Sequence, residues 1–244
     1  MRLPLPVNGR VTDLIPSGLQ ILVCAWITAT VFGAGIVHAQ APQGSIVAWG
    51  RNIEGQTNVP APNNGFIAVA GGELHSLGLK SDGSIVAWGD NSIDQTSVPA
   101  PNTGFVGVAA GGDHSLGLKA DGSIVAWGCG NPYYDYGQCN LPEPNLGFLG
   151  IAAGEYHSLG LKTDGSIVAW GWNNMGQTNV PSPNAVFIGI ASGRSHSLGL
   201  KADGSIVAWG GNNLYGEINI PGPNTGFIAI AAGDDHSLGL KDDG

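Results

Sequence analysis

Five histidines recur at one position of a repeated stretch, and a ring of imidazole groups is a candidate for metal binding or proton transfer. Each histidine lies beside a glycine-containing turn and recurs together with the sequence around it, whereas a catalytic site breaks the symmetry of a repeat. We therefore interpret them as structural residues that hold the turn by hydrogen bonds, and we expect neither a metal ion nor a cofactor. The five are His75, His114, His157, His196 and His236.

The aspartates of the repeat are no better candidates for catalysis. They stand before glycine, which is typical of a tight turn, and Asp-Gly-Ser does not match the Asp-x-Gly of sialidase-type boxes. No Ser/His/Asp or Cys/His arrangement, phosphate-binding glycine loop or cofactor motif is present in the sequence. We predict that the chain is not an enzyme; the alternative is glycan hydrolysis by an acidic pair on one rim. These aspartates are Asp82, Asp121, Asp164, Asp203 and Asp243.

These residues belong to a fifteen-residue stretch, HSLGLKSDGSIVAWG at 75–89. It returns almost unchanged at 114–128, 157–171 and 196–210, with half copies at 44–50 and 236–244. The repeat tryptophans are Trp49, Trp88, Trp127, Trp170 and Trp209, so the steps are 39, 39, 43 and 39 residues. A period near 40 built from short apolar runs indicates a propeller or a solenoid.

Each unit is predicted to form three strands, at 65–71, 75–80 and 84–88 in the first complete copy. Apolar residues on both faces of the third run fit a blade packed between two other blades, with the tryptophans as the packing residues. Gly78 inside the second strand predicts close approach of a neighbouring backbone or indole. The expected fold is an all-β β-propeller with blades of about 39 residues and three to four strands.

The unit G-x-x-H-S-L-G-L-K-x-D-G-S-I-V-A-W-G-x-N-x-x-G-Q-T-x-V-P resembles the repeat of the regulator of chromosome condensation superfamily. Its short form is most similar to the bacterial branch that includes the type II β-lactamase inhibitory protein, and the resemblance covers 44–244. It implies a β-propeller, seven-bladed in the best-known members, that binds proteins through one rim. With five units here, either the chain is part of a longer propeller or 44–50 completes the last blade and closes a five-bladed ring.

Residues 1–39 lie outside the repeat. Arg2 and Arg10 precede an apolar run at 19–37, and Val37-His38-Ala39 has the form of a signal peptidase site. We predict a signal peptide at 1–39 and a repeat domain at 40–244, in a protein that is secreted, periplasmic or at the cell surface. The alternative is a retained membrane anchor. The net charge of -9 argues against nucleic acid as a partner.

Two cysteines flank an insertion in the longest unit. Cys129 and Cys139 enclose the segment GNPYYDYGQ. The unit that contains it is four residues longer than the other units. A cysteine pair in one loop of an exported protein predicts a disulfide, and the alternatives are two free thiols or a soft-metal site.

Function is expected where the repeats differ. The strand order places the loops before each histidine and after each tryptophan on one rim, and exposed aromatic residues there are typical of protein-binding anchors. We predict a protein partner; the alternatives are glycan binding at a cell surface and a purely structural role. The predicted binding residues are Tyr133, Tyr134, Tyr136, Tyr156, Trp172, Tyr215, Glu73, Asp113, Glu155, Arg194 and Asp234.

Overall fold

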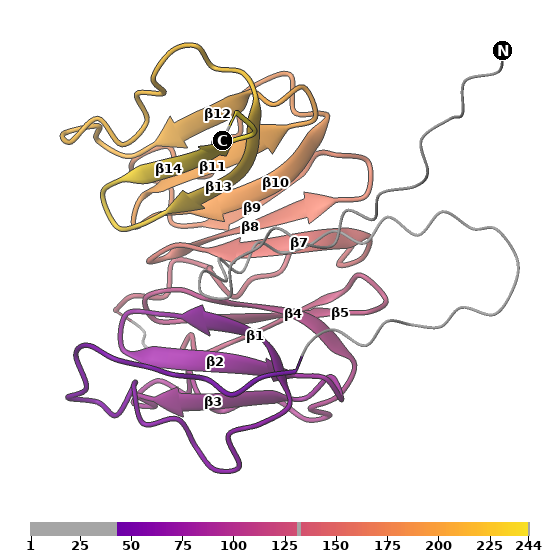
Figure 1. Cartoon of the computed structure of the whole chain (residues 1–244), viewed down its shortest axis with the longest axis vertical. Coiled ribbons are helices and arrows are strands. Elements are labelled where there is room, and N and C mark those ends of the chain that lie inside the picture. Colours follow the sequence, from indigo (N-terminus) through magenta and orange to yellow (C-terminus); the bar gives the residue numbers. More distant parts are fainter. Residues whose placement is uncertain (1–42, 131–132, 244) are drawn as a thin grey trace, which may run out of the picture. The chain divides into compact units, whose positions relative to one another are not determined.

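The structure, a computed structural model, describes residues 43–130 and 133–243 (Figure 1). The predicted signal peptide at 1–39 lies outside these residues, so its cleavage or retention stays a prediction. Within the described ranges every regular element is a strand. None of the described residues belongs to a helix that could cross a membrane.

The strands form blades in the order of the chain. In the first blade β1 (Phe66–Gly71) pairs with β2 (His75–Lys80), which pairs with β3 (Ile85–Gly89), all antiparallel. The three strands expected in a unit are thereby confirmed for the four complete blades. The other blades repeat this order as β4 (Phe105–Ala110), β5 (Ser115–Lys119) and β6 (Ile124–Trp127); β7 (Phe148–Ala153), β8 (His157–Lys162) and β9 (Ile167–Gly171); β10 (Phe187–Ser192), β11 (His196–Lys201) and β12 (Ile206–Gly210); and β13 (Phe227–Ala232) with β14 (Ser237–Lys241).

The Asp-Gly turn sets the register between the second and third strands. Gly83 has a φ of +79°, which favours glycine, and Asp82 Oδ1 accepts hydrogen bonds from the Ser84 N–H at 2.9 Å and the Ser84 hydroxyl at 2.6 Å. These bonds hold the pKa of Asp82 below its usual value. The turn therefore pairs Leu79 with Ile85 and, at the far end, His75 with Gly89.

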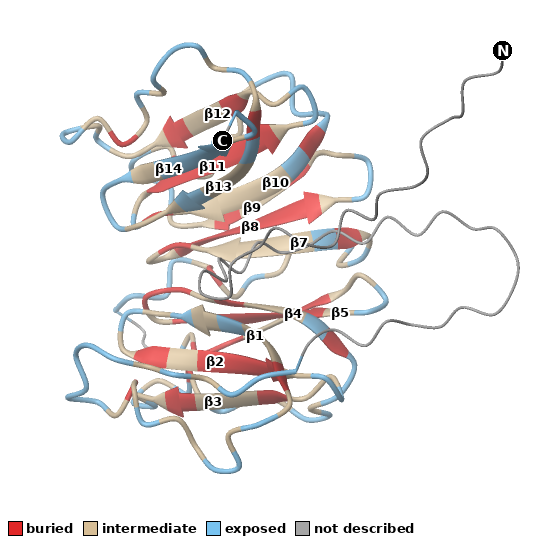
Figure 2. Ribbon diagram, viewed as in Figure 1, coloured by how far each residue is buried: buried red, intermediate tan, exposed pale blue. Residues whose placement is uncertain are grey.

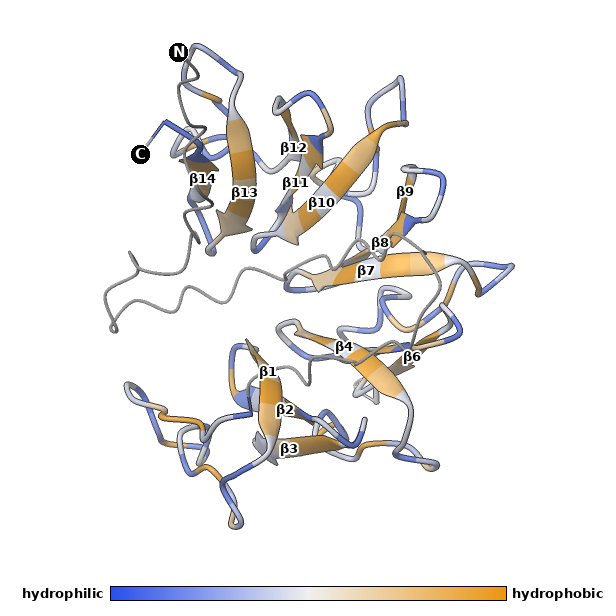
Figure 3. Cartoon of the chain, turned by 45° about the vertical axis from the view of Figure 1, so that its right-hand side comes forward, coloured by the Kyte–Doolittle hydropathy of each residue, from blue (hydrophilic) through white to orange (hydrophobic). Residues whose placement is uncertain are grey.

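The core runs along the middle strands, which Figure 2 shows as the most buried. Leu77, Leu116 and Leu159 are fully buried, because each middle strand lies between two strands of its own blade and contacts the adjacent blades. The first strands of consecutive blades are neighbours as well, and Figure 3 shows these strands as largely hydrophobic. Blade-to-blade packing thus needs apolar residues on both faces of a sheet, as the sequence suggested.

Gly78 and its counterparts make room for a phenylalanine ring of their own blade. A Cβ at Gly117 would lie 2.5 Å from Cε1 of Phe105, and one at Gly78 would lie 2.6 Å from Cε1 of Phe66. The expectation of a neighbouring backbone or indole at Gly78 was therefore wrong. The ring comes from the first strand of the same sheet, which bulges just after the phenylalanine.

Residues 44–50 lie against the first blade. Gly44 forms a bridge to Phe66, and Ile46 exchanges two backbone hydrogen bonds with the Asn63 side chain, each at 2.7 Å. The sheet of β13 and β14 has no third strand among the described residues, so the alternative in which 44–50 completes the last blade is not seen in this part of the chain. On β14 Leu238 and Leu240 are accordingly exposed (Figure 2).

Trp49 departs from the structural role expected of it. Its side chain is 84% exposed, whereas Trp88, Trp127, Trp170 and Trp209 are buried. Each buried indole donates an N–H hydrogen bond to a backbone carbonyl in the loop of the preceding unit. The described residues before Trp49 contain no such loop.

Candidate functional site

Each joint between blades contains a hydrogen-bonded chain of histidine, serine and a backbone carbonyl. His75 Nε2 lies 2.9 Å from Ser115 Oγ in the next blade, and Ser115 donates its hydroxyl hydrogen to the Gln95 carbonyl at 2.8 Å. Trp127 Nε1 donates to the same carbonyl at 3.0 Å. Because the serine hydrogen is already used, Nε2 of His75 must carry the proton and donate to the serine.

The same chain recurs in the later joints. The ring does pack against its own turn, since a Cβ at Gly111 would lie 2.5 Å from His114 Cε1, but its hydrogen bond crosses to the next blade. His236 is exposed, because no blade follows it among the described residues. The recurring partners are His114 with Ser158 and Gln138, His157 with Ser197 and Gln177, and His196 with Ser237 and Glu217.

The buried histidines are neutral at physiological pH. Burial lowers the pKa of His75 to about 4, and burial together with neighbouring imidazoles lowers the pKa of His114 and His157 to about 3. Their Nδ1 atoms are buried without a hydrogen-bond partner. These atoms are closed off from the solvent, and no group of three or more His, Cys, Asp or Glu in the described residues is arranged to hold a metal ion.

Gln138 positions the loop that carries the tyrosines. Its buried side chain accepts from the Tyr136 N–H at 2.8 Å and donates to the Tyr134 carbonyl at 2.8 Å. Cys129 and Cys139 form the predicted disulfide across the same loop, with 6.2 Å between their Cα atoms. Sequence analysis did not single out this glutamine. The recurring Gly-Gln pair after the tryptophans was the available signal.

Four aromatic rings meet on the rim at this loop, and we call Tyr134, Tyr136, Tyr156 and Trp172 the aromatic cluster. The ring of Tyr156 stacks on Tyr134 at 5.7 Å between centroids and meets Tyr136 edge-on at 5.3 Å. Trp172 lies 5.9 Å from Tyr136 and 6.2 Å from Tyr156. Tyr134 and Tyr136 remain 45% and 43% exposed, so the cluster presents aromatic surface to solvent.

Two further predicted aromatic residues are mostly exposed. Tyr133 is on the same loop and 85% exposed. Tyr215 is 74% exposed and lines a surface pocket together with His236 and Leu238. None of the four residues of the aromatic cluster lines this pocket. The six aromatics predicted from sequence are therefore one cluster of four with an exposed neighbour, and a separate tyrosine.

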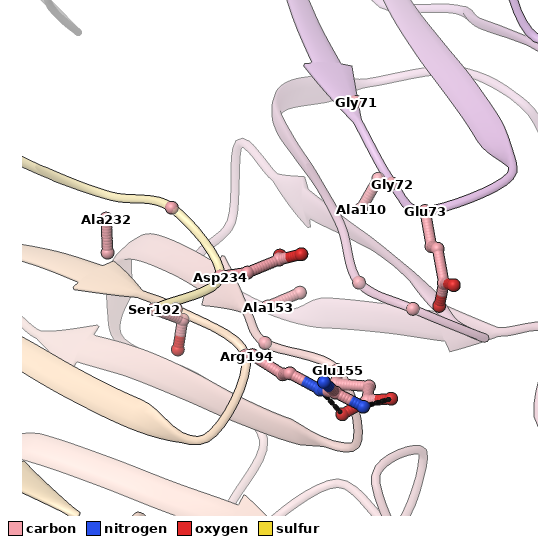
Figure 4. Close-up of a pocket in the computed structure, with 15 residues that line it drawn as sticks. Gly71, Gly72, Glu73, Ala110, Ala153, Glu155, Ser192, Arg194, Ala232 and Asp234 are labelled. Atoms are coloured by element: carbon pink, nitrogen blue, oxygen red, sulfur yellow. Dashed lines mark hydrogen bonds and ion pairs between the residues drawn. The ribbon is translucent and has the colours of Figure 1, made fainter. Parts of the chain in front are cut away.

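The predicted charged residues lie on the loops before the histidines. Glu73, Glu155, Arg194 and Asp234 line a cavity of about 530 Å³ between the ends of the first strands (Figure 4). Arg194 Nε donates to Glu155 Oε2 at 2.8 Å, and Figure 4 shows Asp234 pointing into the space between the loops. Apart from Ser192, the uncharged residues that line the cavity are glycine and alanine, so its charged side chains dominate its chemistry.

Asp113 and Tyr156 connect this cavity to the aromatic cluster. Burial, followed by repulsion from Glu73 and Glu155, raises the pKa of Asp113. Burial, followed by the negative charges of Glu155 and Asp113, raises the pKa of Tyr156. The carboxylates thus act on one another and on the central ring of the cluster, and this part of the rim is electronegative.

The fold and the repeating joints define a β-propeller repeat protein. The profile of the regulator of chromosome condensation (RCC1) repeat matches residues 66–92, 105–138, 149–177 and 187–217. The chain belongs to this repeat superfamily. The predicted bacterial branch is not tested by these matches and stays a prediction. A comparison with curated protein sequences gives no match.

Solved structures share the fold. Prp20p from Saccharomyces cerevisiae, described with its binding to Gsp1p and histones, is 22% identical, with a TM-score of 0.60 over 72% of this chain and 56% of that one. Yeast RCC1 (Prp20) bound to Kap60 is 25% identical, with a TM-score of 0.59 over 73% and 54%. The ectodomain of the Physcomitrella patens receptor kinase CR4 is 26% identical, with a TM-score of 0.63 over 80% and 53%. This chain spans a little over half the length of each.

Proposed function

We propose that this protein is a non-enzymatic protein-interaction module that binds its partner through the rim carrying the aromatic cluster. The observation that carries the proposal is the meeting of four rings from three different loops at one joint. The repeat does not require these rings: the position of Tyr156 is occupied by Asp113 one unit earlier, and that of Trp172 by Asp90 two units earlier. Large, partly exposed aromatic side chains in contact with one another are typical anchors of protein interfaces.

Two further observations favour a protein over a glycan. A lectin built from repeats is expected to place similar aromatic residues in every blade, whereas these rings gather at a single joint. The yeast relatives named above bind proteins. Nucleic acid is a poor partner because a net charge of -9 repels phosphate.

Export is part of the proposal and rests on the sequence of residues 1–39. We propose a protein that is secreted, periplasmic or at the cell surface. The disulfide between Cys129 and Cys139 fits an oxidising compartment.

A capture experiment tests the binding function. The chain is immobilised and exposed to secreted and surface fractions, beside the double variant Tyr134→Ala/Tyr136→Ala and the control Tyr215→Ala, which removes an exposed tyrosine outside the cluster. We expect the original chain and the control to retain the same protein, and the double variant to lose it. Equal capture by all three would overturn the aromatic rim as the binding site, and retention of polysaccharide alone would favour the glycan alternative.

A further inference from the structure

We propose that the segment seated on the aromatic cluster is basic, with an arginine or lysine side chain that lies on the rings and faces the carboxylates beside them. This inference rests on the proposed function and adds the chemistry of the partner.

The rings are arranged to receive a cation. The face of an aromatic ring is negative and attracts an ammonium or guanidinium group within about 6 Å of its centre. Tyr134 and Tyr136 are nearly half exposed, and the Tyr156 ring connects them. The same chain uses this contact internally, since Lys119 Nζ lies 3.6 Å from the centre of the Phe105 ring and Lys162 Nζ 3.7 Å from that of Phe148.

The charge beside the rings selects the sign of the partner. Glu73, Asp113 and Glu155 all act on Tyr156, and the single ion pair among the described residues joins Glu155 to Arg194. Glu73 and Asp113 therefore have no cationic partner within the described part of the chain. A basic side chain would relieve the repulsion around Asp113, whereas an acidic or phosphorylated segment would add to it.

The surface is large enough for a peptide segment. The cavity of about 530 Å³ is lined by Glu73 and Asp234 and continues the acidic surface away from the rings. One basic residue of the partner on the aromatic cluster and a second one near the cavity would each lie close to a carboxylate. This extent favours a protein segment over an isolated small cation.

The test compares two peptides that differ in charge and not in shape. An acetylated tetra-arginine peptide and the matched tetra-citrulline peptide are titrated into the full chain by calorimetry at low and moderate salt. We expect the arginine peptide to bind at least about tenfold more tightly than the citrulline peptide, and its affinity to fall as salt rises. Equal binding of both peptides, or no binding of either, would overturn the inference.

Variants locate the effect. Glu73→Gln/Asp113→Asn should weaken the arginine peptide severalfold, and Tyr134→Ala/Tyr136→Ala should do the same. Asp164→Asn, on an exposed turn of the opposite rim, is the matched control and should change nothing. Equal weakening by all three variants would indicate a general charge effect and contradict the assigned surface. Displacement of the peptide by equimolar spermine would do the same, since it would indicate a site for small polycations.

The two proposals fail differently. If capture of the natural partner needs the aromatic cluster but the arginine peptide does not bind, the basic segment is wrong and the binding function stands. If the arginine peptide binds but capture of the natural partner does not need the aromatic cluster, the surface binds cations but is not the site of the proposed function.

Discussion

At the scale of single residues, the joint between blades explains why the histidine is repeated. Its Nε2 donates to a serine whose own hydrogen is given to a carbonyl that also accepts a tryptophan N–H. Only the neutral Nε2–H form satisfies this chain, because a proton on the buried Nδ1 would have no acceptor. The histidine is therefore a structural donor whose charge state is fixed by burial.

Acid should weaken the fold before its carboxylates are protonated. Unfolding releases His75, His114 and His157 to a pKa near 6.5, whereas the folded values are about 4, 3 and 3. Between pH 6.5 and 4 the unfolded chain binds more protons, so the free energy of unfolding should fall as pH falls, by up to about 1.4 kcal/mol per pH unit for each histidine. Denaturant unfolding at a series of pH values measures this slope.

A variant assigns the slope to the joints. His114→Gln keeps a side-chain N–H but cannot titrate, so it should remove about one histidine's share of the slope. His236→Gln, at an exposed position, is the control. A free energy of unfolding that stays constant from pH 6.5 to 4.5 in the original chain would contradict the neutral buried histidines.

At the scale of strands, the glycine of each middle strand admits the phenylalanine of the first. Gly117→Ala would place a Cβ 2.5 Å from the Phe105 ring and should destabilise the fold by about 1–3 kcal/mol. Gly107→Ala is the control, because its Cβ would meet Leu118 Cβ at an ordinary 3.4 Å. Thermal unfolding compares the two; equal melting temperatures would show that the ring moves aside without cost.

At the scale of loops, the disulfide and Gln138 together hold the tyrosines against the next blade. The double variant Cys129→Ser/Cys139→Ser removes a cross-link between residues ten positions apart. The loop-entropy relation predicts that the free energy of unfolding falls by about 3 kcal/mol. We expect the near-ultraviolet circular dichroism of the packed rings to weaken while the far-ultraviolet signal of the strands persists. The Tyr215→Ala variant should keep both signals. An undiminished near-ultraviolet signal in the serine variant would mean that Gln138 alone suffices.

The sequence was sufficient to predict the elements but not the contacts between side chains. Strands, Asp-Gly turns and the disulfide follow local rules of periodicity, turn chemistry and cysteine spacing. Which atom His75 bonds depends on the packing of one blade against the next, and which ring fills the space at Gly78 depends on the pairing of β1 with β2 within a blade. Likewise, an aromatic loop was visible in the sequence, but the separation of Tyr215 from the other rings required coordinates.

At the scale of the whole repeat domain, the two rims differ in kind. One repeats the same turn in the four complete units, with an aspartate that accepts a hydrogen bond from the serine two residues on, as at Asp164 and Ser166. The other carries the loops that vary, with the aromatic cluster and the electronegative cavity side by side on them. Uniform turns serve the fold, so we propose that the partner binds on the varied rim.

Amide hydrogen exchange with and without the captured partner tests this placement most directly. We predict slower exchange on binding at 133–140, 155–157 and 172–176, where the backbone carries the aromatic cluster. The Asp-Gly turns around Asp82, Asp121, Asp164 and Asp203 should exchange as before. Protection confined to those turns, with the tyrosine loop unaffected, would contradict the central claim and move the binding surface to the opposite rim.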